Sequence, residues 1–279
     1  MIPVSVTLET TRKCNLNCKM CFADATNNPN EPILDFSILV TALDELIEMG
    51  VTSFLISGGE PTMYPHFKDL ISYFHRHSIV PGIATNGTLL TNELCQFLSF
   101  EGMTHNVYVS LDSYRADVHD SIRGRECFHL ICNNIQNLVK NNIKFAISFV
   151  AMNANSDSID EMYRLADSLG ASFLNLIRFN LEGRGQLNKT ELSLKKGLTF
   201  EELIEQYAKN YNGVYCFGGE NCILPIRLKV NKKMLPDDSD LSKYLIIRSN
   251  GNVHIGRASS NVVIGNIYEC KIGELISGL

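Results

Sequence analysis

The sequence lacks the features that mark several protein classes. No apolar run approaches the length of a membrane span, and the first residues lack the charged-then-apolar pattern of a secretion signal. Positive charge is not in excess, because the formal net charge is −5, whereas nucleic-acid binding needs clustered Lys and Arg. We therefore expect a cytoplasmic protein whose main partner is neither a membrane nor a nucleic acid.

Cysteine is abundant, with nine in 279 residues, and three of them stand close together as Cys14, Cys18 and Cys21. In a reducing compartment cysteines indicate metal or cluster chemistry rather than disulfides. A cubane of four irons needs one thiolate per iron, so three thiolates on one loop leave one iron open. A structural zinc site usually has four ligands in paired knuckles, and no second knuckle follows at the usual distance. The spacing therefore predicts an open iron–sulfur cluster.

The other candidate metal ligands show no such pattern. The histidines at 66, 75, 77 and 105 share no ligand spacing, so we expect them on helix surfaces or in turns. Cys95, Cys127 and Cys132 lie on helical patterns, where a buried structural thiol is the default.

Strand-like and helical segments alternate from the amino terminus to residue 178. We predict strands over 4–9, 54–57, 80–84, 106–112, 144–150 and 172–178, with helices between them and a polar turn at 120–124. This alternation is typical of a parallel sheet with right-handed crossovers. Six units fall short of the eight that close a barrel. The sequence therefore predicts an α/β fold built on a partial (β/α)6 TIM-like barrel.

Polar and glycine-rich segments follow these strands. In parallel barrels the loops at the carboxyl ends of the strands form the active site. The segments that follow strands are the cysteine loop, Gly58-Gly59-Glu60-Pro61, Thr85-Asn86-Gly87, Ser110-Leu111-Asp112 and Asn153. We therefore expect one site at one rim of the barrel.

The loop Cys14-x3-Cys18-x2-Cys21, after a strand-like segment, resembles the signature loop of the radical S-adenosylmethionine (radical SAM) enzymes, and 58–61 is similar to their GGEP motif. Met20 stands where the family often has an aromatic residue. The resemblance implies a [4Fe–4S] cluster on the three cysteines whose open iron binds SAM. Reduction then cleaves SAM to methionine and a 5′-deoxyadenosyl radical, which abstracts hydrogen from a substrate. It also implies an electron donor such as flavodoxin or ferredoxin.

Two rim segments, 58–61 and 110–112, suggest contacts with SAM. Gly58 and Gly59 let the backbone come close to a ligand, because glycine has no side chain to obstruct it. Strand-edge carbonyls and Glu60 are predicted to receive the SAM ammonium. Ser110 and Asp112 suit a ribose diol or the polar end of methionine, although a helix cap or turn is the alternative.

The remaining rim residues rest more on position. Arg123 could hold the methionine carboxylate through two parallel bonds, or form a surface salt bridge. Thr85 and Asn86 resemble the family's third-strand element, but Thr-Asn-Gly is also good turn chemistry. Val150 and Asn153 fall where the family contacts adenine.

The region 199–279 is predicted to be an extension of the barrel domain at 1–198. Two strands joined at Asn250-Gly251 give a hairpin signal, and the order resembles the α+β SPASM or twitch extension, which carries auxiliary iron–sulfur clusters. The cysteine expected there around 256–260 is missing, and the three scattered thiols Cys216, Cys222 and Cys270 make a poor closed cluster. We expect an extension without a full auxiliary cluster. Alternatively, Cys216 or Cys222 returns a hydrogen atom to a substrate radical, as an epimerase requires.

The SPASM-like ending and the segment Arg178–Gly185 favour a ribosomally synthesised peptide as substrate, for crosslinking or epimerisation; solvated arginines are the alternative for that segment. Because the chain begins directly with a strand, a partner protein or the barrel rim would have to bind a leader peptide. The rival is a radical SAM enzyme of small-molecule or cofactor biosynthesis, as in the molybdenum-cofactor and haem pathways. A non-enzymatic metal-binding interaction module is a third hypothesis.

Overall fold

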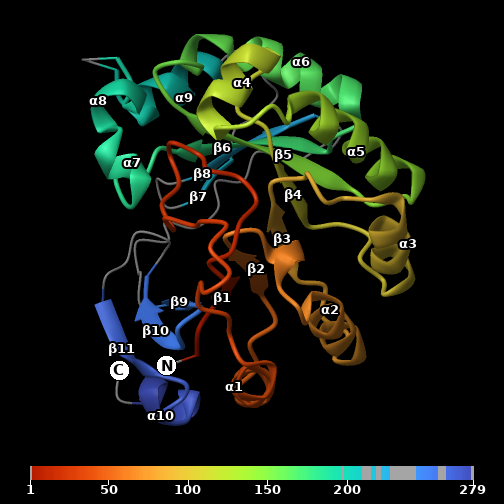
Figure 1. Ribbon diagram of the computed structural model, residues 1–279, viewed down its shortest axis with the longest axis vertical. Coiled ribbons are helices and arrows are strands. Elements are labelled where there is room, and N and C mark those ends of the chain that lie inside the picture. The colour runs from red at the N-terminus through yellow and green to blue at the C-terminus, as the bar shows by residue number, and fades with distance from the viewer. Residues whose placement is uncertain are drawn as a thin grey trace.

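A computed structural model describes residues 2–195, 198–208, 215–217, 221–226, 243–256 and 262–277. Its strands form one sheet in the order β11-β10-β9-β1-β2-β3-β4-β5-β6-β8-β7 (Figure 1). The central six strands are parallel and follow the chain order: β1 (Ser5–Thr11), β2 (Phe54–Gly58), β3 (Gly82–Thr85), β4 (Val107–Ser110), β5 (Phe145–Ala151) and β6 (Phe173–Arg178). The predicted partial barrel of six strand–helix units is confirmed.

The connecting helices lie on the outer side of the curved sheet (Figure 1). They are α1 (Phe36–Glu48), α2 (Phe67–Arg76), α3 (Asn92–Phe100), α4 (Ala116–Arg123), α5 (Phe128–Lys140) and α6 (Ile159–Leu169), with short 3-10 turns η1 (Pro61–Met63) and η2 (Ser156–Ser158). Asp35 caps α1, because its side chain accepts from the N–H groups of Ser37 and Ile38. The two faces of the sheet are therefore distinct, with one covered by helices.

The strand residues divide between these faces. Val107, Val109, Ile147 and Phe149 are fully buried on the helix-covered face. Because successive side chains of a strand point to opposite faces, their neighbours Ser110 and Ser148 point to the inner side. Ser110, Ser148 and Asn175 stand in register on β4, β5 and β6. The inner side of the barrel therefore carries a polar row near the carboxyl ends of the strands.

The predicted polar turn at 120–124 is wrong, since residues 116–123 form α4 and Gly124 is its left-handed cap. The helix is short, and its buried side chains are His119, Ile122 and Arg123. Two of these three are polar, so the segment shows no apolar periodicity. The two buried polar side chains, His119 and Arg123, bond to Asp112 and Cys18.

Strands beyond residue 199 extend the sheet at both edges. β8 (Asn221–Pro225) pairs antiparallel with β6, and β7 (Tyr215–Phe217) pairs with β8. β9 (Tyr244–Ile247) pairs parallel with β1, and β10 (Asn252–Ile255) and β11 (Val262–Asn266) follow antiparallel, which confirms the hairpin at Asn250-Gly251. The helices of this half are α7 (Arg184–Leu187), α8 (Lys189–Leu192), α9 (Phe200–Ala208) and α10 (Ile272–Ser277). The domain boundary at 198/199 stays a prediction.

Within the described ranges, no helix combines the length and the apolarity that crossing a bilayer requires.

Candidate active site

The cysteine loop, residues 12–26, leaves the carboxyl end of β1 and carries the three predicted ligands. Cys14 and Cys18 are buried and Cys21 is half-buried, and none forms a disulfide. The sulfur of Cys14 accepts from the N–H of Leu16 at 3.4 Å, and the sulfur of Cys21 accepts from the N–H of Ala25 at 3.4 Å. The Arg123 guanidinium lies 3.8 Å from the Cys18 sulfur. Each sulfur therefore has a donor suited to a metal-bound thiolate.

Burial alone would keep these thiols neutral. Burial raises the pKa of Cys14 to about 12 and also raises the pKa of Cys18, against the lowering effect of Arg123. A coordinated metal ion reverses this preference, because a ligating thiol loses its proton outright. Cys14 and Cys18 are therefore not reactive free thiolates, and a metal bound by the loop would displace their protons.

The number and type of donors on the loop indicate which metal group it suits. Among the described residues, the group whose ligand atoms all lie within 4.8 Å of one another is His119, Asp120 and Cys127, and the loop cysteines form no such group. Three thiolates on one short loop match the protein ligands of a cubane that keeps one iron open. The donor set of the loop fits three corners of a [4Fe–4S] cluster.

Gly58-Gly59-Glu60 lies against the cysteine loop. The N–H of Gly59 donates to the carbonyl of Thr11 at 2.7 Å, and the N–H of Glu60 donates to the carbonyl of Lys13 at 2.9 Å. A Cβ on Gly59 would stand 2.4 Å from the Lys13 carbonyl oxygen. The close approach that these glycines permit is therefore made to the loop backbone.

The Glu60 side chain is fully buried and accepts four hydrogen bonds. Oε1 accepts from the hydroxyls of Thr62 and Thr85 and from the N–H of Thr62, and Oε2 accepts from the N–H of Asn86 at 2.7 Å. Burial raises the pKa of this carboxyl, and the four donors oppose that effect. Glu60 joins the β2 and β3 rim segments, and a direct contact with the SAM ammonium stays a prediction.

Asn86 continues this network to the cysteine loop. Its Nδ2 donates to Asn15 Oδ1 at 2.9 Å and lies 3.8 Å from the Cys14 sulfur. Its Oδ1 accepts from Thr88, whose hydroxyl accepts from Asn15. The Thr-Asn-Gly segment therefore makes a turn and also fixes the loop beside the first cysteine.

Asp112 and Arg123, predicted separately, form a buried ion pair. Arg123 Nη2 lies 2.5 Å from Asp112 Oδ2, and the N–H of Val150 donates to Asp112 Oδ1 at 2.9 Å. Arg123 also reaches the Cys18 sulfur. Of the two alternatives for Arg123, the structure has a salt bridge, but it is buried at the site and not on the surface. Ligand contacts of Asp112, Arg123 and Val150 stay predictions.

Two residues of this network, His119 and Asn155, were not predicted from the sequence. His119 Nδ1 accepts from the N–H of Asp112 at 3.1 Å, and Asn155 Nδ2 donates to the carbonyls of Asp112 and Val150. His119 lies inside α4, seven residues after Asp112, and Asn155 is the residue before η2. For Asn155, a polar residue at a cap-like position after a strand was the available signal.

The compact group of His119, Asp120 and Cys127 is explained without a metal. Burial, and secondly Arg123, lowers the pKa of His119 to about 4, so its ring is neutral. Its Nε2 lies 3.6 Å from the Cys127 sulfur. Asp120 Oδ1 accepts from the N–H groups of Cys127 and Phe128 at the start of α5. Cys127 is the predicted buried thiol, although it precedes the helix.

Other predicted site residues are not brought into this network. Ser110 is half-buried on the inner side. The Asn153 side chain is exposed, and the backbone N–H of Asn153 donates to the Leu192 carbonyl. The backbones of Cys216 and Cys222 pair with each other in β7 and β8, and Cys222 stands opposite Leu176 of β6. Their side chains lie outside the described part of the chain, so the hydrogen-donor role stays a prediction.

The two arginines after β6 have protein partners. Arg178 forms an ion pair with Glu201 and lies over the Phe200 ring. Arg184 Nε donates to the Cys18 carbonyl at 2.9 Å, and its Nη1 lies 3.0 Å from Asp24 Oδ1. The alternative of solvated arginines does not hold for Arg184, because that side chain bonds to the cysteine loop.

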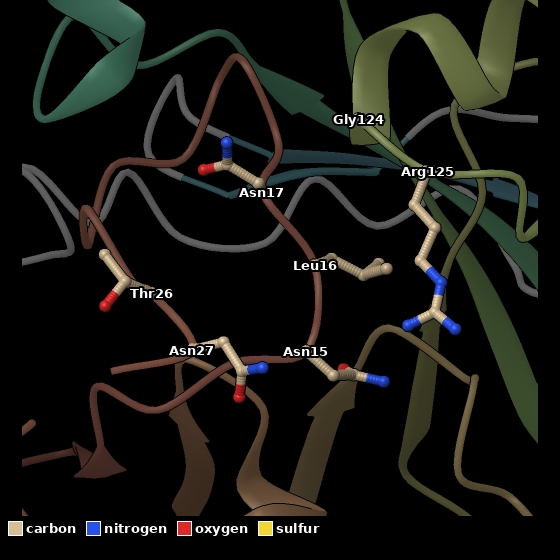
Figure 2. A pocket seen from close by; sticks show the side chains of 7 residues that line it. All are labelled: Asn15, Leu16, Asn17, Thr26, Asn27, Gly124 and Arg125. Carbon is tan, nitrogen blue, oxygen red and sulfur yellow. The ribbon is translucent and has the colours of Figure 1, made fainter. Parts of the chain in front are cut away.

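A cleft of about 400 Å³ opens beside the cysteine loop (Figure 2). Figure 2 shows the loop as one wall and the end of α4, with Arg125, as the other. The lining residues are Asn15, Leu16, Asn17, Thr26, Asn27, Gly124 and Arg125. None of the predicted SAM contacts lines it. Its lining combines amide and hydroxyl groups with apolar surface, and the charged residue among those seven is a cation, Arg125.

Comparison with known proteins places these features in a family. A family model described as the radical SAM superfamily matches residues 8–166, which include the three cysteines, the GGEP segment and the Asp112–Arg123 pair.

Three curated relatives cover about two thirds of the chain. The mycofactocin maturase MftC of Mycolicibacterium smegmatis is 34% identical over 185 residues, or 66% of this chain and 46% of the relative. The antilisterial bacteriocin subtilosin biosynthesis protein AlbA of Bacillus subtilis is 29% identical, over 66% of this chain and 41% of its own. The AdoMet-dependent heme synthase of Methanosarcina barkeri is 30% identical, over 66% and 52%. The chain spans about half the length of the curated relatives it matches.

Solved structures confirm the fold. SuiB of Streptococcus suis, in a crystal structure bound to the precursor peptide SuiA, matches with a TM-score of 0.70 at 15% identity, over 99% of this chain and 64% of that one. The likeness extends through the strands beyond β6, and at this identity it shows the fold alone.

Proposed function

This chain belongs to the radical SAM superfamily, and from that premise we propose that it modifies a ribosomally synthesised peptide by hydrogen abstraction. The cofactors of the superfamily are a [4Fe–4S] cluster and SAM. Bound together, they supply a 5′-deoxyadenosyl radical when the reduced cluster cleaves SAM. The observation that carries the proposal is the cysteine loop at the carboxyl edge of the parallel sheet, with an N–H donor on each sulfur.

The protein's own part is to hold and orient the reactants. Cys14, Cys18 and Cys21 would supply three thiolates, so that one iron remains for SAM. Gly58, Gly59, Glu60, Thr85 and Asn86 would present the second and third rim segments to SAM. In this proposal Glu60 acts by fixing both segments, since its carboxylate already has four protein donors.

The fourth and fifth strands would complete the SAM site. We place Ser110, Asp112 and Arg123 near the ribose and methionine ends, and Val150 and Asn153 near adenine. The polar row of Ser148 and Asn175 continues inward from Ser110. In this arrangement the substrate would meet SAM on the inner side of the barrel.

A peptide substrate is favoured by the relatives rather than by a described pocket. Similarity is highest to a maturase among the three relatives compared, and a second relative serves bacteriocin biosynthesis. The heme synthase similarity supports a small-molecule substrate as the second candidate. An epimerase would need a hydrogen donor, for which Cys216 or Cys222 is proposed, and a crosslinking enzyme would not.

Two partners belong to the proposal. Flavodoxin or ferredoxin would reduce the cluster, and the cleft beside the loop, whose charge comes from Arg125, suits an acidic donor. A separate leader-binding protein would present the peptide. The residues from 199 onward would act as a SPASM/twitch-like extension without a full auxiliary cluster.

Anaerobic turnover tests the cofactor chemistry. Wild-type protein with SAM and dithionite is expected to release 5′-deoxyadenosine, and Cys18→Ala to release none. Cys132→Ala is the matched control, because that thiol is half-buried on α5 and is not part of the loop. Unchanged release from Cys18→Ala would exclude Cys18 as a cluster ligand, and no release from the wild type would favour a non-enzymatic metal-binding module.

Co-expression tests the substrate class. The protein is produced with the short open reading frames that flank its gene, in deuterated water, and the peptides are weighed. One non-exchangeable deuterium means epimerisation, and loss of two hydrogens means a crosslink or desaturation. Unchanged peptides with steady 5′-deoxyadenosine formation would transfer the proposal to a small-molecule substrate.

A further inference from the structure

The segment after β6, residues 183–192, lies against the cysteine loop, and we call it the clasp. It contains α7 and α8, which stand beside the loop in Figure 1. The clasp and the cysteine loop lie about 170 residues apart in the sequence. The ion pair between Lys19 and Glu191, for example, joins residues 172 positions apart. We propose that the clasp holds the cysteine loop in its cluster-binding conformation.

The contacts are made to the loop backbone. Arg184 Nε donates to the Cys18 carbonyl at 2.9 Å, and the N–H of Arg184 donates to the Cys21 carbonyl at 3.0 Å. Asn188 Nδ2 donates to the Lys19 carbonyl at 3.0 Å. Three carbonyls between the second and third ligands therefore have donors from the clasp. A loop has no repeating ladder to satisfy such groups, so these donors fix the direction of its peptide units.

The backbone of the clasp is in close contact with the backbone of the cysteine loop at Gly183. Gly183 has φ of +51°, and a Cβ there would stand 2.5 Å from the Cys21 carbonyl oxygen and 2.6 Å from that of Phe22. Only a residue without a side chain fits this approach. The glycine thus brings the N–H of Arg184 to Cys21.

Charge adds to the fit. The Arg184 side chain is 15% exposed, and its Nη1 lies 3.0 Å from Asp24 Oδ1, at the far end of the loop from Cys18. One planar guanidinium therefore joins Cys18 to Asp24 across the third ligand, Cys21. Lysine carries a single ammonium and cannot reproduce this fork.

The clasp also reaches the fifth-strand rim. The N–H of Asn153 donates to the carbonyl of Leu192 at 3.0 Å. The cysteine loop is held from its other side by α4, since the N–H of Lys19 donates to the Ile122 carbonyl at 2.9 Å. One segment after β6 thus sets the relative position of the loop and the fifth rim segment.

This inference rests on the proposed function only in taking the three cysteines as cluster ligands. Arg184 and Asn188 are positioning residues, since they act through the loop backbone and touch no sulfur. The test therefore reads cluster retention in the absence of SAM and substrate.

Reconstituted wild type and Arg184→Met are compared for iron release to a chelator and for the electron paramagnetic resonance spectrum of the reduced cluster. Arg184→Met is expected to release iron about tenfold faster and to give a broadened spectrum. The main cause is loss of the charge-assisted hydrogen bond to the Cys18 carbonyl, because the pair with the exposed Asp24 adds little. Arg184→Lys is expected to fall between the two. Arg178→Met is the matched control, because that arginine pairs with Glu201 outside the clasp, and should match wild type.

Asn188→Ala provides an independent variant should Arg184→Met fail to fold as the apoprotein, and a threefold faster release is expected. Wild-type release rates and line widths in a folded Arg184→Met, or in Asn188→Ala, would overturn the clasp. Failure of the proposed function would give a different result, in which the wild type retains its cluster but produces no 5′-deoxyadenosine.

Discussion

The carboxylate of Glu60 accepts hydrogen bonds from the second and third rim segments, and its atoms are fully buried. A buried acceptor with several donors is costly to alter, because each donor left without a partner loses its hydrogen bond and cannot reach water. Glu60 therefore acts as a junction between two loops that local sequence alone would treat separately.

Glu60→Gln is expected to lower the free energy of unfolding by about 1–3 kcal/mol, because its amide N–H2 would face the N–H of Asn86 or the hydroxyl of Thr85. Denaturant unfolding of the apoprotein measures this. Glu93→Gln is the control, since that side chain is 86% exposed and its replacement should leave stability unchanged. Equal stability of Glu60→Gln and wild type would contradict the junction role.

His119 gives the site a pH dependence. Burial, and secondly Arg123, lowers its pKa from 6.5 to about 4, and Asp112, Asp120 and Cys127 also face the ring. Between pH 6.5 and 4 the unfolded chain binds a proton that the folded chain does not. Stability therefore falls as the pH falls through this window, by about 3 kcal/mol from this residue.

His119→Asn is expected to flatten that dependence while keeping an acceptor for the Asp112 N–H. Thermal midpoints of wild type and variant from pH 7 to pH 4 make the comparison. Parallel curves would show that His119 titrates normally in the folded protein.

At the scale of elements, the β9–β10 hairpin turns at Gly251, which has φ of +85°. A Cβ there would stand 2.2 Å from the Tyr268 ring. Gly251→Ala is expected to cost about 1–3 kcal/mol from backbone strain, and the ring clash adds to this. Gly50→Ala is the matched control, because Gly50 has φ of +93° with nothing within 4 Å, so it carries strain only. A smaller loss for Gly251→Ala than for Gly50→Ala in denaturant unfolding would contradict the packing argument.

Most of the elements could be predicted from sequence because their signals are local. The six parallel strands are short apolar runs, and the Asp35 cap and the Asn250-Gly251 turn each depend on neighbouring residues. α4 escaped because its buried positions include His119 and Arg123. The clasp escaped because Arg184 and Asn188 bond to backbone carbonyls, which any residue type offers.

The predicted site residues also divide into those with a local sequence signal and those whose contacts depend on the fold. The cysteine spacing is a chemical signature, so Cys14, Cys18 and Cys21 could be predicted directly as cluster ligands. The sequence predicts Asp112 and Arg123 as ligand contacts. Their pairing with each other, and the contact of Arg123 with Cys18, depend on how α4 packs. Asn153 and Asn155 stand two positions apart, and Asn155 is buried while Asn153 is exposed. The sequence alone does not indicate which of the two is buried.

At the scale of the molecule, the chain is predicted to hold one cluster. Among the described residues, the cysteines outside the loop are dispersed: Cys95 and Cys132 lie on separate helices, Cys127 faces His119, and Cys270 bonds to the Asn266 carbonyl. Iron and sulfide analysis of the reconstituted protein should give about four irons per chain. About eight would show a second cubane and contradict the prediction.

The edges of the sheet could not be predicted from sequence. β8 joins β6 and β9 joins β1, and both pairings link residues whose separation leaves no local pattern. The sequence distinguished a region after residue 198 but did not indicate that its strands complete the barrel's own sheet.

The pairing of Ser5 with Tyr244 and of Leu8 with Ile247 has a consequence for biosynthesis. A ribosome adds residues from the amino terminus onward, so β1 leaves it well before β9 exists. Until then the strand that leads into the cysteine loop has one unpaired edge, which is a template for association with other chains. The clasp is made in the interval between the two strands. The nascent chain can therefore form the contacts between the clasp and the cysteine loop before β9 pairs with the free edge of β1.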